Sequence, residues 1–593
     1  MGPSLPLKGG VFLLHPPDRP GEWPLPPLDH LNAFLHWIRP LVEEDAFLVS
    51  RQSLHDFLQP AGDGEKLQQK LIDISRRQNS HWLTPLWHEQ YLAYRGRLAG
   101  SLNYYVVLDN HRFAARHTVA TLAAGLLDAL TREYLDVVSR RLPVERLDGR
   151  PLCMSQYDRM FKAVRLPLPQ KDCYRVYPPA DPHHVVVFYR DRLFQVKVTD
   201  GQGHPLSTDH LASQIQRLMN NARPDQGPGV GVLTTACRDD AAQMYEAIAQ
   251  NPVNQQSLEV IRTALFVLCI DPKTEDRQAL QKRMLLSTGR NRYFDKSCQI
   301  MLTENLEIGF NGEHTAVDGT PWFHLLNRVV DRLAAEGPAV AAPAAAAMPE
   351  ELAWNLSEEI RTALGRLLAD HQAVADSLYV DHLDFRRYGK EQIKQWGMSP
   401  DAFFQAALQL AQYRTFGQLR STYESVSMRH FSQGRTECAR AVHPETLRFV
   451  RAVCAEKISA AELKPLFLEA QRAHTERIRQ CREGLGIERH LFALRSVYEE
   501  QGASLGIDQR PALFDSPGYR QLTHDFISTS GAGSGSISLF GFGPVTDDGY
   551  GIGYVIRDDS LHVTLSTHRV HREKGIQLLH YLEEGLQCFS EWN

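Results

Sequence analysis

Residues 184–190 read HVVVFYR, and this run of β-branched and aromatic side chains is the stretch that decides the class of fold. Two similar runs follow, LFQVKV at 193–198 and TALFVLCI at 263–270, and residues 207–222 (STDHLASQIQRLMNNA) between them have helical spacing. Short β-rich runs that alternate with helical stretches are typical of a mixed α/β domain. The sequence therefore predicts an α/β domain built around these strands.

The length of the chain indicates more than one domain. A chain of 593 residues is too long for one hydrophobic core and fits two domains of roughly 200–300 residues. Residues 337–351 (GPAVAAPAAAAMPEE) are rich in alanine and proline, which is typical of a linker or surface loop. We expect an α/β domain over 91–345 and a second α/β domain over 346–593, with a helical segment over 1–90 that packs on the second domain.

The second half of the chain repeats the mixed pattern of the first. Residues 351–378 have helical spacing, GYVIRDD at 553–559 and LHVTLSTH at 561–568 resemble strands, and residues 574–592 have the spacing of a closing helix. The expected fold class is therefore α/β in both domains.

Composition and motif searches exclude several classes of function. The net charge of −5 argues against a general nucleic-acid binder, which would be strongly basic. No G-x-G-x-x-G lies at a strand-to-helix turn and no G-x-x-x-x-G-K-[ST] occurs, so neither a nicotinamide cofactor nor nucleoside triphosphate hydrolysis is expected.

The nine cysteines are scattered, without a C-x-x-C pair or histidines at ligand spacing, so we expect no metal and a reducing compartment. The N-terminus lacks the pattern of a secretory signal, no apolar run of about 18 residues occurs, and the last three residues are not a peroxisomal address. A cytoplasmic location is the expectation.

The segment EHTAVDG at 313–319 carries the first candidate for chemistry. His314 follows a predicted strand, Leu306–Phe310, and an Asn-Gly pair, which places it at the edge of a cleft, with Asp318 four residues later. A neutral imidazole can take a proton from a hydroxyl or a thiol near pH 7. The alternative is an ordinary turn with a surface or core histidine, and the motif alone does not decide between them.

Two stretches of the second half are also candidates. Ser399 as N-cap and the apolar residues Phe403, Ala407, Leu410 and Ala411 predict a helix that begins after Ser399. Lys390 and Lys394 just before it would repel each other unless an anion lies between them, and the alternative is a solvated face. Residues 526–555 place hydroxyl side chains beside a glycine-rich stretch, which indicates either a flexible loop or donors to an oxyanion.

Five segments together resemble the choline/carnitine O-acyltransferase family, in the family's order and over nearly the whole chain. They are PLCMSQYDRMFKAVRLP (151–167), NRYFDKS followed by EHTAVDG, TYESVSMRHFSQGRTE, the STS of 528–530, and FGPVTDDGYG. The resemblance implies two similar domains of the chloramphenicol-acetyltransferase type with an active-site tunnel at their interface. It also implies coenzyme A as a co-substrate, with no permanently bound cofactor.

The resemblance assigns roles residue by residue. His314 matches the catalytic base of a direct, ternary-complex transfer, and Asp318 matches the acidic residue that follows it. Ser530 matches the hydroxyl that stabilises the oxyanion, and Ser528 lies beside the acceptor. The remaining matches are Lys390, Lys394 and Asp401 for coenzyme A, and Tyr423, Thr436, Arg489 and Phe542 for carnitine.

The acceptor and the acyl group follow from single positions. Arg489 and Thr436 match the carnitine enzymes of the family, whose acceptor carries a carboxylate, rather than the choline enzymes. Phe540 stands where longer-chain enzymes have glycine, which favours a short acyl group, although Gly541 would loosen the neighbourhood. Gly531 departs from the glutamine that commonly follows STS.

We therefore expect a monomeric enzyme that exchanges a short acyl group between coenzyme A and carnitine, with small molecules as its only partners. The alternatives are choline or another acceptor, a medium- or long-chain carnitine enzyme and, last, a non-catalytic binding module.

Overall fold

The computed structural model describes the chain in seven ranges: 20–78, 81–180, 182–223, 227–342, 346–455, 459–533 and 535–591. Parts of several sequence predictions lie outside these ranges, namely residues 1–19 and 79–80 of the N-terminal segment, 343–345 of the linker, Ser534 of the glycine-rich stretch, and residues 592–593.

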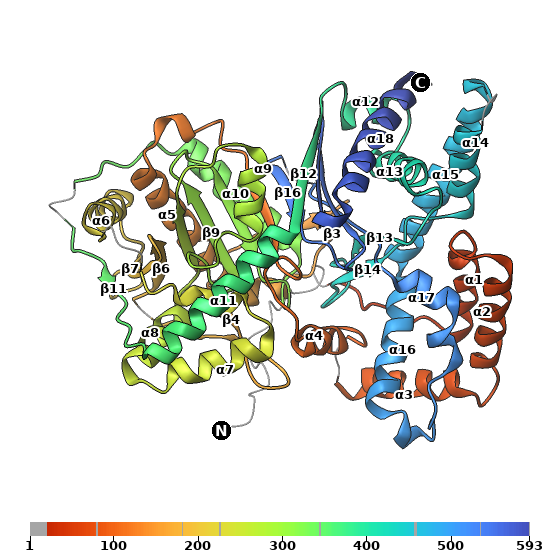
Figure 1. The fold of residues 1–593 in the computed structure, drawn as a ribbon, viewed down its shortest axis with the longest axis horizontal. Coiled ribbons are helices and arrows are strands. Elements are labelled where there is room, and N and C mark those ends of the chain that lie inside the picture. Colours follow the sequence, from red (N-terminus) through yellow and green to blue (C-terminus); the bar gives the residue numbers. More distant parts are fainter. Residues whose placement is uncertain are drawn as a thin grey trace. The chain divides into compact units, whose positions relative to one another are not determined.

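The chain forms two compact units, whose elements are labelled in Figure 1. Unit 1 contains Gln90–Ser377 and Ser534–Gly543, and unit 2 contains Pro20–Glu89, Leu378–Gly533 and Pro544–Asn593. The units thus separate after Ser377 rather than at residue 345, and a short segment of the C-terminal half belongs to unit 1.

The position of this boundary has a packing reason. Helix α11 (Glu358–Ser377) buries Leu364 and Leu367 in one hydrophobic cluster with Val230 and Leu233 of the short helix η4 (Val230–Thr235). Since these side chains complete the core of unit 1, the helix that follows the alanine-rich segment stays with the first unit.

Unit 1 is built on an eight-stranded mixed sheet. In spatial order its strands are β11 (Glu350–Glu351), β7 (Arg192–Lys197), β6 (His184–Tyr189), β8 (Val267–Asp271), β9 (Cys298–Thr303), β10 (Ile308–Gly312), β1 (Tyr104–Leu108) and β16 (Ile537–Phe542). Its main helices are α5 (Val119–Val138), α6 (Thr208–Asn221), α7 (Arg238–Ala249), α8 (Pro252–Thr263), α9 (Arg277–Leu285), α10 (Gly319–Ala335) and α11. Two small hairpins complete it, β2 (Arg146–Leu147) with β3 (Arg150–Pro151) and β4 (Ala163–Leu166) with β5 (Cys173–Val176).

Unit 2 is built on a six-stranded mixed sheet. In spatial order its strands are β12 (Leu378–Phe385), β18 (Leu561–His568), β17 (Tyr550–Ile556), β15 (Ile527–Gly531), β13 (Thr422–Ser427) and β14 (Thr436–Cys438). Its helices are α1 (Ala33–Ile38), α2 (Glu44–Phe57), α3 (Asp63–Gln78), α12 (Lys390–Gln395), α13 (Pro400–Phe416), α14 (Pro444–Cys454), α15 (Ala460–Gln480), α16 (Glu488–Gln501), α17 (Pro517–Thr523) and α18 (Arg572–Glu591). Helix α4 (Thr84–Ala93) contains the point where the chain passes from unit 2 to unit 1.

The two sheets share one topology. The strands β7-β6-β8-β9-β10-β1 of unit 1 correspond, in order and in direction, to β14-β13-β15-β17-β18-β12 of unit 2. In each set the second, third and fourth strands are parallel and the flanking pairs are antiparallel. This agrees with the expected pair of similar α/β domains.

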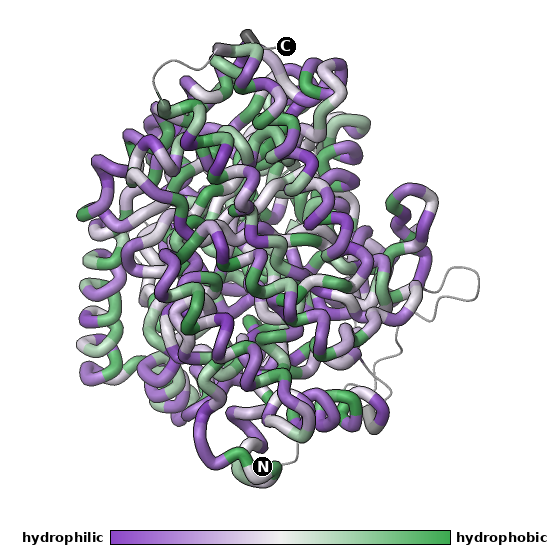
Figure 2. The backbone as a smooth tube through the Cα atoms, turned by 90° about the vertical axis from the view of Figure 1, so that its right-hand side faces the viewer, coloured by the Kyte–Doolittle hydropathy of each residue, from purple (hydrophilic) through white to green (hydrophobic). Residues whose placement is uncertain are grey.

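The helices follow their sequence signals closely. Ser399 caps α13 by accepting from the Ala402 N–H at 3.4 Å, and Phe403, Ala407 and Leu410 on its inner face are fully buried. Figure 2 shows hydrophilic residues interrupting the hydrophobic ones along the helices. Among the described residues, no helix is both long and apolar enough to cross a membrane.

The strand before His314 is shifted from its prediction. The sequence predicted Leu306–Phe310 followed by an Asn-Gly turn, whereas β10 begins at Ile308 and includes Asn311 and Gly312. The reason is tertiary, because Asn311 and Gly312 are paired in register with both β9 and β1.

Candidate active site

His314 lies in the turn that joins β10 to α10 of unit 1. Its Nδ1 is 3.1 Å from the main-chain carbonyl oxygen of Val317. A carbonyl oxygen only accepts, so Nδ1 carries a proton, and in the neutral form of the ring Nε2 is the nitrogen that can accept one. The half-buried ring also contacts Tyr91 and Tyr104, with ring centroids 5.6 Å and 5.2 Å away. This geometry suits a general base that accepts through Nε2.

Asp318 ends the same turn and is tied to a distant motif. Its carboxylate accepts from the Gln156 side-chain amide at 3.0 Å, and its main-chain N–H donates to the Gln156 side-chain oxygen at 2.7 Å. Asp318 also occupies the N-cap position of α10, where a negative charge is favoured. These contacts fit a residue that fixes the turn more closely than one that relays a proton.

Buried charges hold the turn from its other side. The Arg165 guanidinium donates to the Thr315 hydroxyl at 3.0 Å and to Asp172 at 2.7 Å. Asp172 also accepts from Arg238 at 2.6 Å, and Arg238 in turn pairs with Asp295 at 2.7 Å. Burial raises the pKa of the Asp295 carboxyl to about 6 even though Arg238 opposes the shift. One network of buried charges therefore joins three of the sequence motifs, PLCMSQY…RLP, YFDKS and EHTAVDG. The motifs themselves did not predict this network.

Phe540 lies in an aromatic cluster of unit 1. It is 4% exposed, and its ring centroid is 5.5 Å from that of Phe323 and 6.1 Å from that of Tyr104. Gly541 faces the opposite side of β16, where an added Cβ would lie 2.6 Å from the Tyr105 hydroxyl oxygen, so it does not belong to this cluster. The cluster thus leaves little space around Phe540.

Phe542 also lies on β16 and therefore belongs to unit 1, whereas the other residues predicted to bind carnitine belong to unit 2. Its half-buried ring is 5.7 Å from Phe540.

Arg489 is the centre of a buried polar group in unit 2. Its side chain is 3% exposed and forms an ion pair with Glu488. It donates to the Tyr423 hydroxyl at 3.0 Å and to the main-chain oxygen of Thr436 at 3.0 Å, and it lies 4.0 Å above the Trp87 ring. The Arg489 guanidinium thus polarises the Tyr423 hydroxyl through this hydrogen bond, while Glu488 offsets part of the charge of Arg489.

Further buried charges around Arg489 were not found from the sequence. Glu488 also accepts from Arg440 at 2.9 Å, and Glu437 accepts from the Arg489 main-chain N–H at 3.1 Å. Burial raises the pKa of Glu437 to about 7, and Arg489 opposes that shift. No short motif links these positions, so only the packing of β14 against α16 reveals them.

The serines of STS lie beside Tyr423. Ser528 on β15 is paired in register with Tyr423 on the parallel strand β13. Because alternate residues of a strand share a face, Ser530 lies on the same face as Ser528, and its hydroxyl is 3.4 Å from that of Ser425. Two neighbouring strands thus bring a tyrosine and three serine hydroxyls to one face of the sheet.

Gly531, the departure from the family pattern, has a steric explanation. A Cβ at this position would lie 2.8 Å from the ring of Tyr554 on the adjacent strand β17. Tyr554 is buried and donates to Asp401 at 2.5 Å. The tyrosine fills the space that a larger side chain at residue 531 would need.

The predicted lysine pair is only partly as expected. Lys390 and Lys394 lie four residues apart on α12, but the Lys390 ammonium is 2.7 Å from the Asp558 carboxylate. Their mutual repulsion is thus offset by a carboxylate of the chain itself, and both side chains are accessible to solvent.

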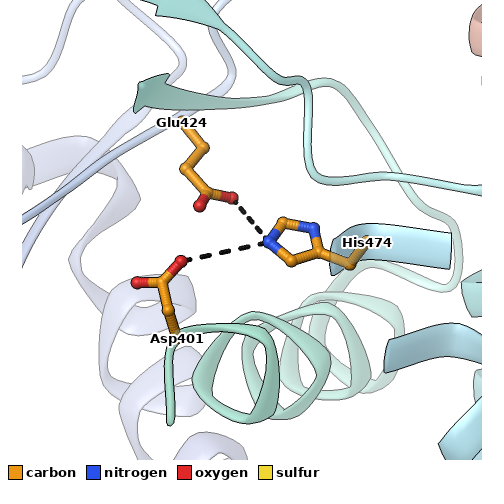
Figure 3. A group of neighbouring side chains, drawn as sticks. All are labelled: Asp401, Glu424 and His474. Carbon is orange, nitrogen blue, oxygen red and sulfur yellow. Dashed lines mark ion pairs between the residues drawn. The ribbon is translucent and has the colours of Figure 1, made fainter. Parts of the chain in front are cut away.

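Asp401, predicted to bind coenzyme A, faces Glu424 and His474, and no sequence motif links these two residues to it. Figure 3 shows Asp401 at the start of α13, Glu424 on β13 and His474 on α15 pointing toward one another. The His474 Nε2 is 3.2 Å from Glu424 and 4.0 Å from Asp401. Burial raises the pKa of Glu424 to about 7 and lowers that of His474 to about 4.

The chain thus has two α/β units of one topology, with a histidine turn in the first and strand-borne serines in the second, as expected for a pair of chloramphenicol-acetyltransferase-like domains. A family model described as choline/carnitine O-acyltransferase matches residues 23–584. The chain belongs to the choline/carnitine O-acyltransferase family.

Curated relatives of three different kinds match over almost the full chain. Carnitine O-acetyltransferase of Columba livia is 30% identical over 97% of this chain and 94% of its own length. Carnitine O-palmitoyltransferase 2 of Homo sapiens is 28% identical over 95% and 92%, and choline O-acetyltransferase of Danio rerio is 30% identical over 96% and 91%. Since the three identities are so similar, the acceptor and the acyl group have to be argued from individual residues.

Proposed function

We propose that this enzyme reversibly transfers a short acyl group between coenzyme A and the hydroxyl of carnitine. The observation that carries the proposal is the buried Arg489, hydrogen-bonded to the Tyr423 hydroxyl on the strand face that also bears Ser528. A cation behind a hydroxyl donor is an arrangement that receives a carboxylate, which carnitine has and choline lacks. Thr436 and Tyr423 would contact the carboxylate, with Arg489 acting largely through Tyr423.

The chemistry begins at His314. Its Nε2 removes the proton of the carnitine hydroxyl while the oxygen attacks the thioester carbonyl carbon, forming a tetrahedral intermediate. The Ser530 hydroxyl donates to the oxygen that becomes negative. When the intermediate collapses, the carbon–sulfur bond breaks and the coenzyme A thiolate takes the proton from His314. The acyl group passes directly between the two substrates, without an acyl-enzyme.

The hydrogen bond of the His314 Nδ1 supports this direction of proton transfer. With Nδ1 bound to the Val317 carbonyl, Nε2 is the atom that accepts, and the imidazolium formed during the reaction keeps that hydrogen bond. Asp318 is assigned a positioning role through Gln156.

The remaining assignments concern the other parts of the two substrates. Lys390 and Lys394 are proposed to meet phosphate groups of coenzyme A, and the first would exchange Asp558 for that ligand. Asp401 is proposed to contact the same co-substrate. Phe542 is proposed to meet the trimethylammonium group, since an aromatic face attracts a quaternary cation.

A short acyl group is proposed because Phe540 is closely surrounded. The ring contacts of Phe540 with Phe323 and Tyr104 leave little room for a long chain.

The test is a substrate matrix with purified protein. Acetyl-, butyryl-, octanoyl- and palmitoyl-coenzyme A are each combined with carnitine or choline, and release of the coenzyme A thiol is followed. Acetyl-coenzyme A with carnitine is expected to be fastest. Faster reaction with choline would overturn the acceptor, and faster reaction with octanoyl- or palmitoyl-coenzyme A would overturn the acyl length. Thiol release that persists in His314→Ala would be independent of the proposed base.

A further inference from the structure

We propose that Asp401, Glu424 and His474 form a binding site for one divalent transition-metal ion within unit 2. The three side chains come from separate elements, the first turn of α13, the strand β13 and the helix α15, and they converge on one point (Figure 3). Their candidate ligand atoms all lie within 4.8 Å of one another.

The spacing of the three side chains fits a metal ion. A metal with ligands at about 2.1 Å separates neighbouring ligand atoms by roughly 3.0–3.4 Å in octahedral or tetrahedral geometry. The His474 Nε2 is 3.2 Å from the nearer Glu424 oxygen and 4.0 Å from the nearer Asp401 oxygen. Small side-chain adjustments would bring all three atoms within reach of one ion.

Two of the three ligand atoms are buried and have no hydrogen-bond partner. They are Oε2 of Glu424 and Nε2 of His474, in side chains that are 4% and 5% exposed. Although the two atoms are close, they do not meet the angular requirements of a hydrogen bond. A buried polar atom without a partner is costly, and a cation between the two would satisfy both.

The surroundings of the site resemble an outer coordination shell. The other ring nitrogen of His474, Nδ1, is 3.3 Å from Nε2 of the buried His443, so its ring orientation is fixed. Tyr554 donates to Oδ1 of Asp401, which leaves Oδ2 directed at His474. Hydrogen bonds of this kind orient ligands in metal sites.

The ligand set selects the class of metal. One imidazole with two carboxylates suits Zn²⁺ or Mn²⁺, whereas Mg²⁺ and Ca²⁺ favour oxygen ligands alone. Asp401 is 45% exposed, so an ion could enter from that side and keep open positions for water or another ligand. The sequence expectation of no metal rested on cysteine spacing, which does not address a site made from carboxylates and one histidine.

This inference goes beyond the proposed function and does not depend on it, although both use Asp401. The alternative occupant of the same space is a proton shared by the two carboxyl groups. A direct measurement of metal binding therefore separates the two occupants, and it also separates this proposal from any result on acyl transfer.

The experiment is a titration of chelator-treated full-length protein with Zn²⁺, followed by calorimetry and by elemental analysis after gel filtration. Parallel titrations use Mn²⁺ and Mg²⁺. The variants are His474→Gln and Glu424→Gln, with Tyr554→Phe as an outer-shell variant. His580→Gln is the matched control, because it removes an exposed histidine that pairs with Glu584 on α18. Circular dichroism verifies the fold of each variant.

We expect one equivalent of Zn²⁺ bound by the unmodified protein and by His580→Gln, with Mg²⁺ much weaker. Binding should be lost in His474→Gln and Glu424→Gln, and should weaken about 10-fold to 100-fold in Tyr554→Phe. A Co²⁺-loaded sample should show visible d–d absorption that His474→Gln lacks. Absence of stoichiometric binding to the unmodified protein would overturn the proposal even if both variants failed to fold. Retention of the bound ion in a folded His474→Gln or Glu424→Gln protein would overturn it as well.

Discussion

The ring of His314 is fixed by the carbonyl oxygen of Val317, three residues further along the same turn and 3.1 Å from Nδ1. One hydrogen bond therefore sets both the tautomer and the direction of Nε2. Since Val317 is fully buried, this acceptor is held in place by the core of unit 1.

Replacement of His314 by alanine should abolish most of the turnover. General-base catalysis contributes about 10²-fold to 10⁴-fold, so kcat should fall at least within that range. The KM for carnitine should change little, because none of the residues proposed to bind carnitine is removed by this substitution. Steady-state thiol release gives both constants, and a kcat near that of the unmodified enzyme would contradict the assigned base.

Arg165→Met tests whether the buried charge network supports the catalytic turn. The substitution leaves Asp172 with only one of its two buried guanidinium partners. Removing one partner of a buried ion pair costs about 3–5 kcal/mol. Urea unfolding should give a lower free energy of unfolding by that order. The exposed pair Arg112–Asp331 supplies the control, since Arg112→Met should change stability by less than about 1 kcal/mol.

Tyr423→Phe tests the acceptor site without creating a cavity. It removes the hydroxyl that accepts from Arg489 and is proposed to donate to the carboxylate of carnitine. A lost hydrogen bond to a charged group costs about 1.5–3 kcal/mol, so the KM for carnitine should rise roughly tenfold or more. The KM for acetyl-coenzyme A should stay nearly constant, and an equal rise in both constants would argue against a specific role at the acceptor.

The sequence predicted well what depends on local signals and motifs. The Ser399 cap and the buried face of α13 follow from side-chain hydrogen bonding and apolar spacing over a few residues, and β18 (Leu561–His568) coincides with its β-rich run. The β-rich run 553–559 was only partly correct, because β17 spans Tyr550–Ile556. The family and the fold class also followed from motifs in order.

Contacts between residues far apart in the chain could not be predicted from the sequence. Residues 537–542 join the sheet of unit 1 because β1 accepts them as its neighbour, a relationship that no local pattern encodes. The convergence of His474 with Asp401 and Glu424 depends likewise on how α15 packs, and His474 lies in a helix without a motif. The predicted roles of all the site residues, the short acyl group, the cytoplasmic location and the monomeric state stay predictions.

Lys296→Met should change how stability depends on pH. Lys296 is fully buried, its ammonium donates to the Arg262 carbonyl oxygen at 2.9 Å, and burial lowers its pKa from 10.5 to about 7. Between these two values the unfolded chain binds a proton that the folded protein does not, so this residue makes the free energy of unfolding rise with pH from about 7 to 10.5. Below pH 7 the full cost of burying the charge is present.

The variant lacks this titration, so its free energy of unfolding should rise less than that of the unmodified protein between pH 7 and pH 10. Urea unfolding at three pH values measures the difference, and the exposed Lys273→Met serves as the control. Parallel pH profiles for Lys296→Met and the unmodified protein would contradict the assignment.

Phe540→Gly should shift the acyl preference toward longer chains. The phenylalanine is 4% exposed and packs against Phe323 and Tyr104, so its removal should open a cavity next to two aromatic rings. If the acyl group extends there, the ratio of octanoyl to acetyl turnover should rise about tenfold or more, since each added methylene buried in a pocket contributes about 1 kcal/mol.

A second substitution can enlarge the cavity further, provided that it does not disturb the ring of His314, the proposed base. Tyr104 also contacts the His314 ring, so changing it would disturb the acetyl reaction itself, whereas no ring contact joins Phe323 to His314 among the described residues. Phe540→Gly combined with Phe323→Ala should therefore widen the preference further while acetyl turnover stays measurable. Stability should fall by about 3–5 kcal/mol for each lost ring, so activity is compared at a temperature where both proteins remain folded. An unchanged ratio of octanoyl to acetyl turnover in the folded double variant would place the acyl chain away from Phe540.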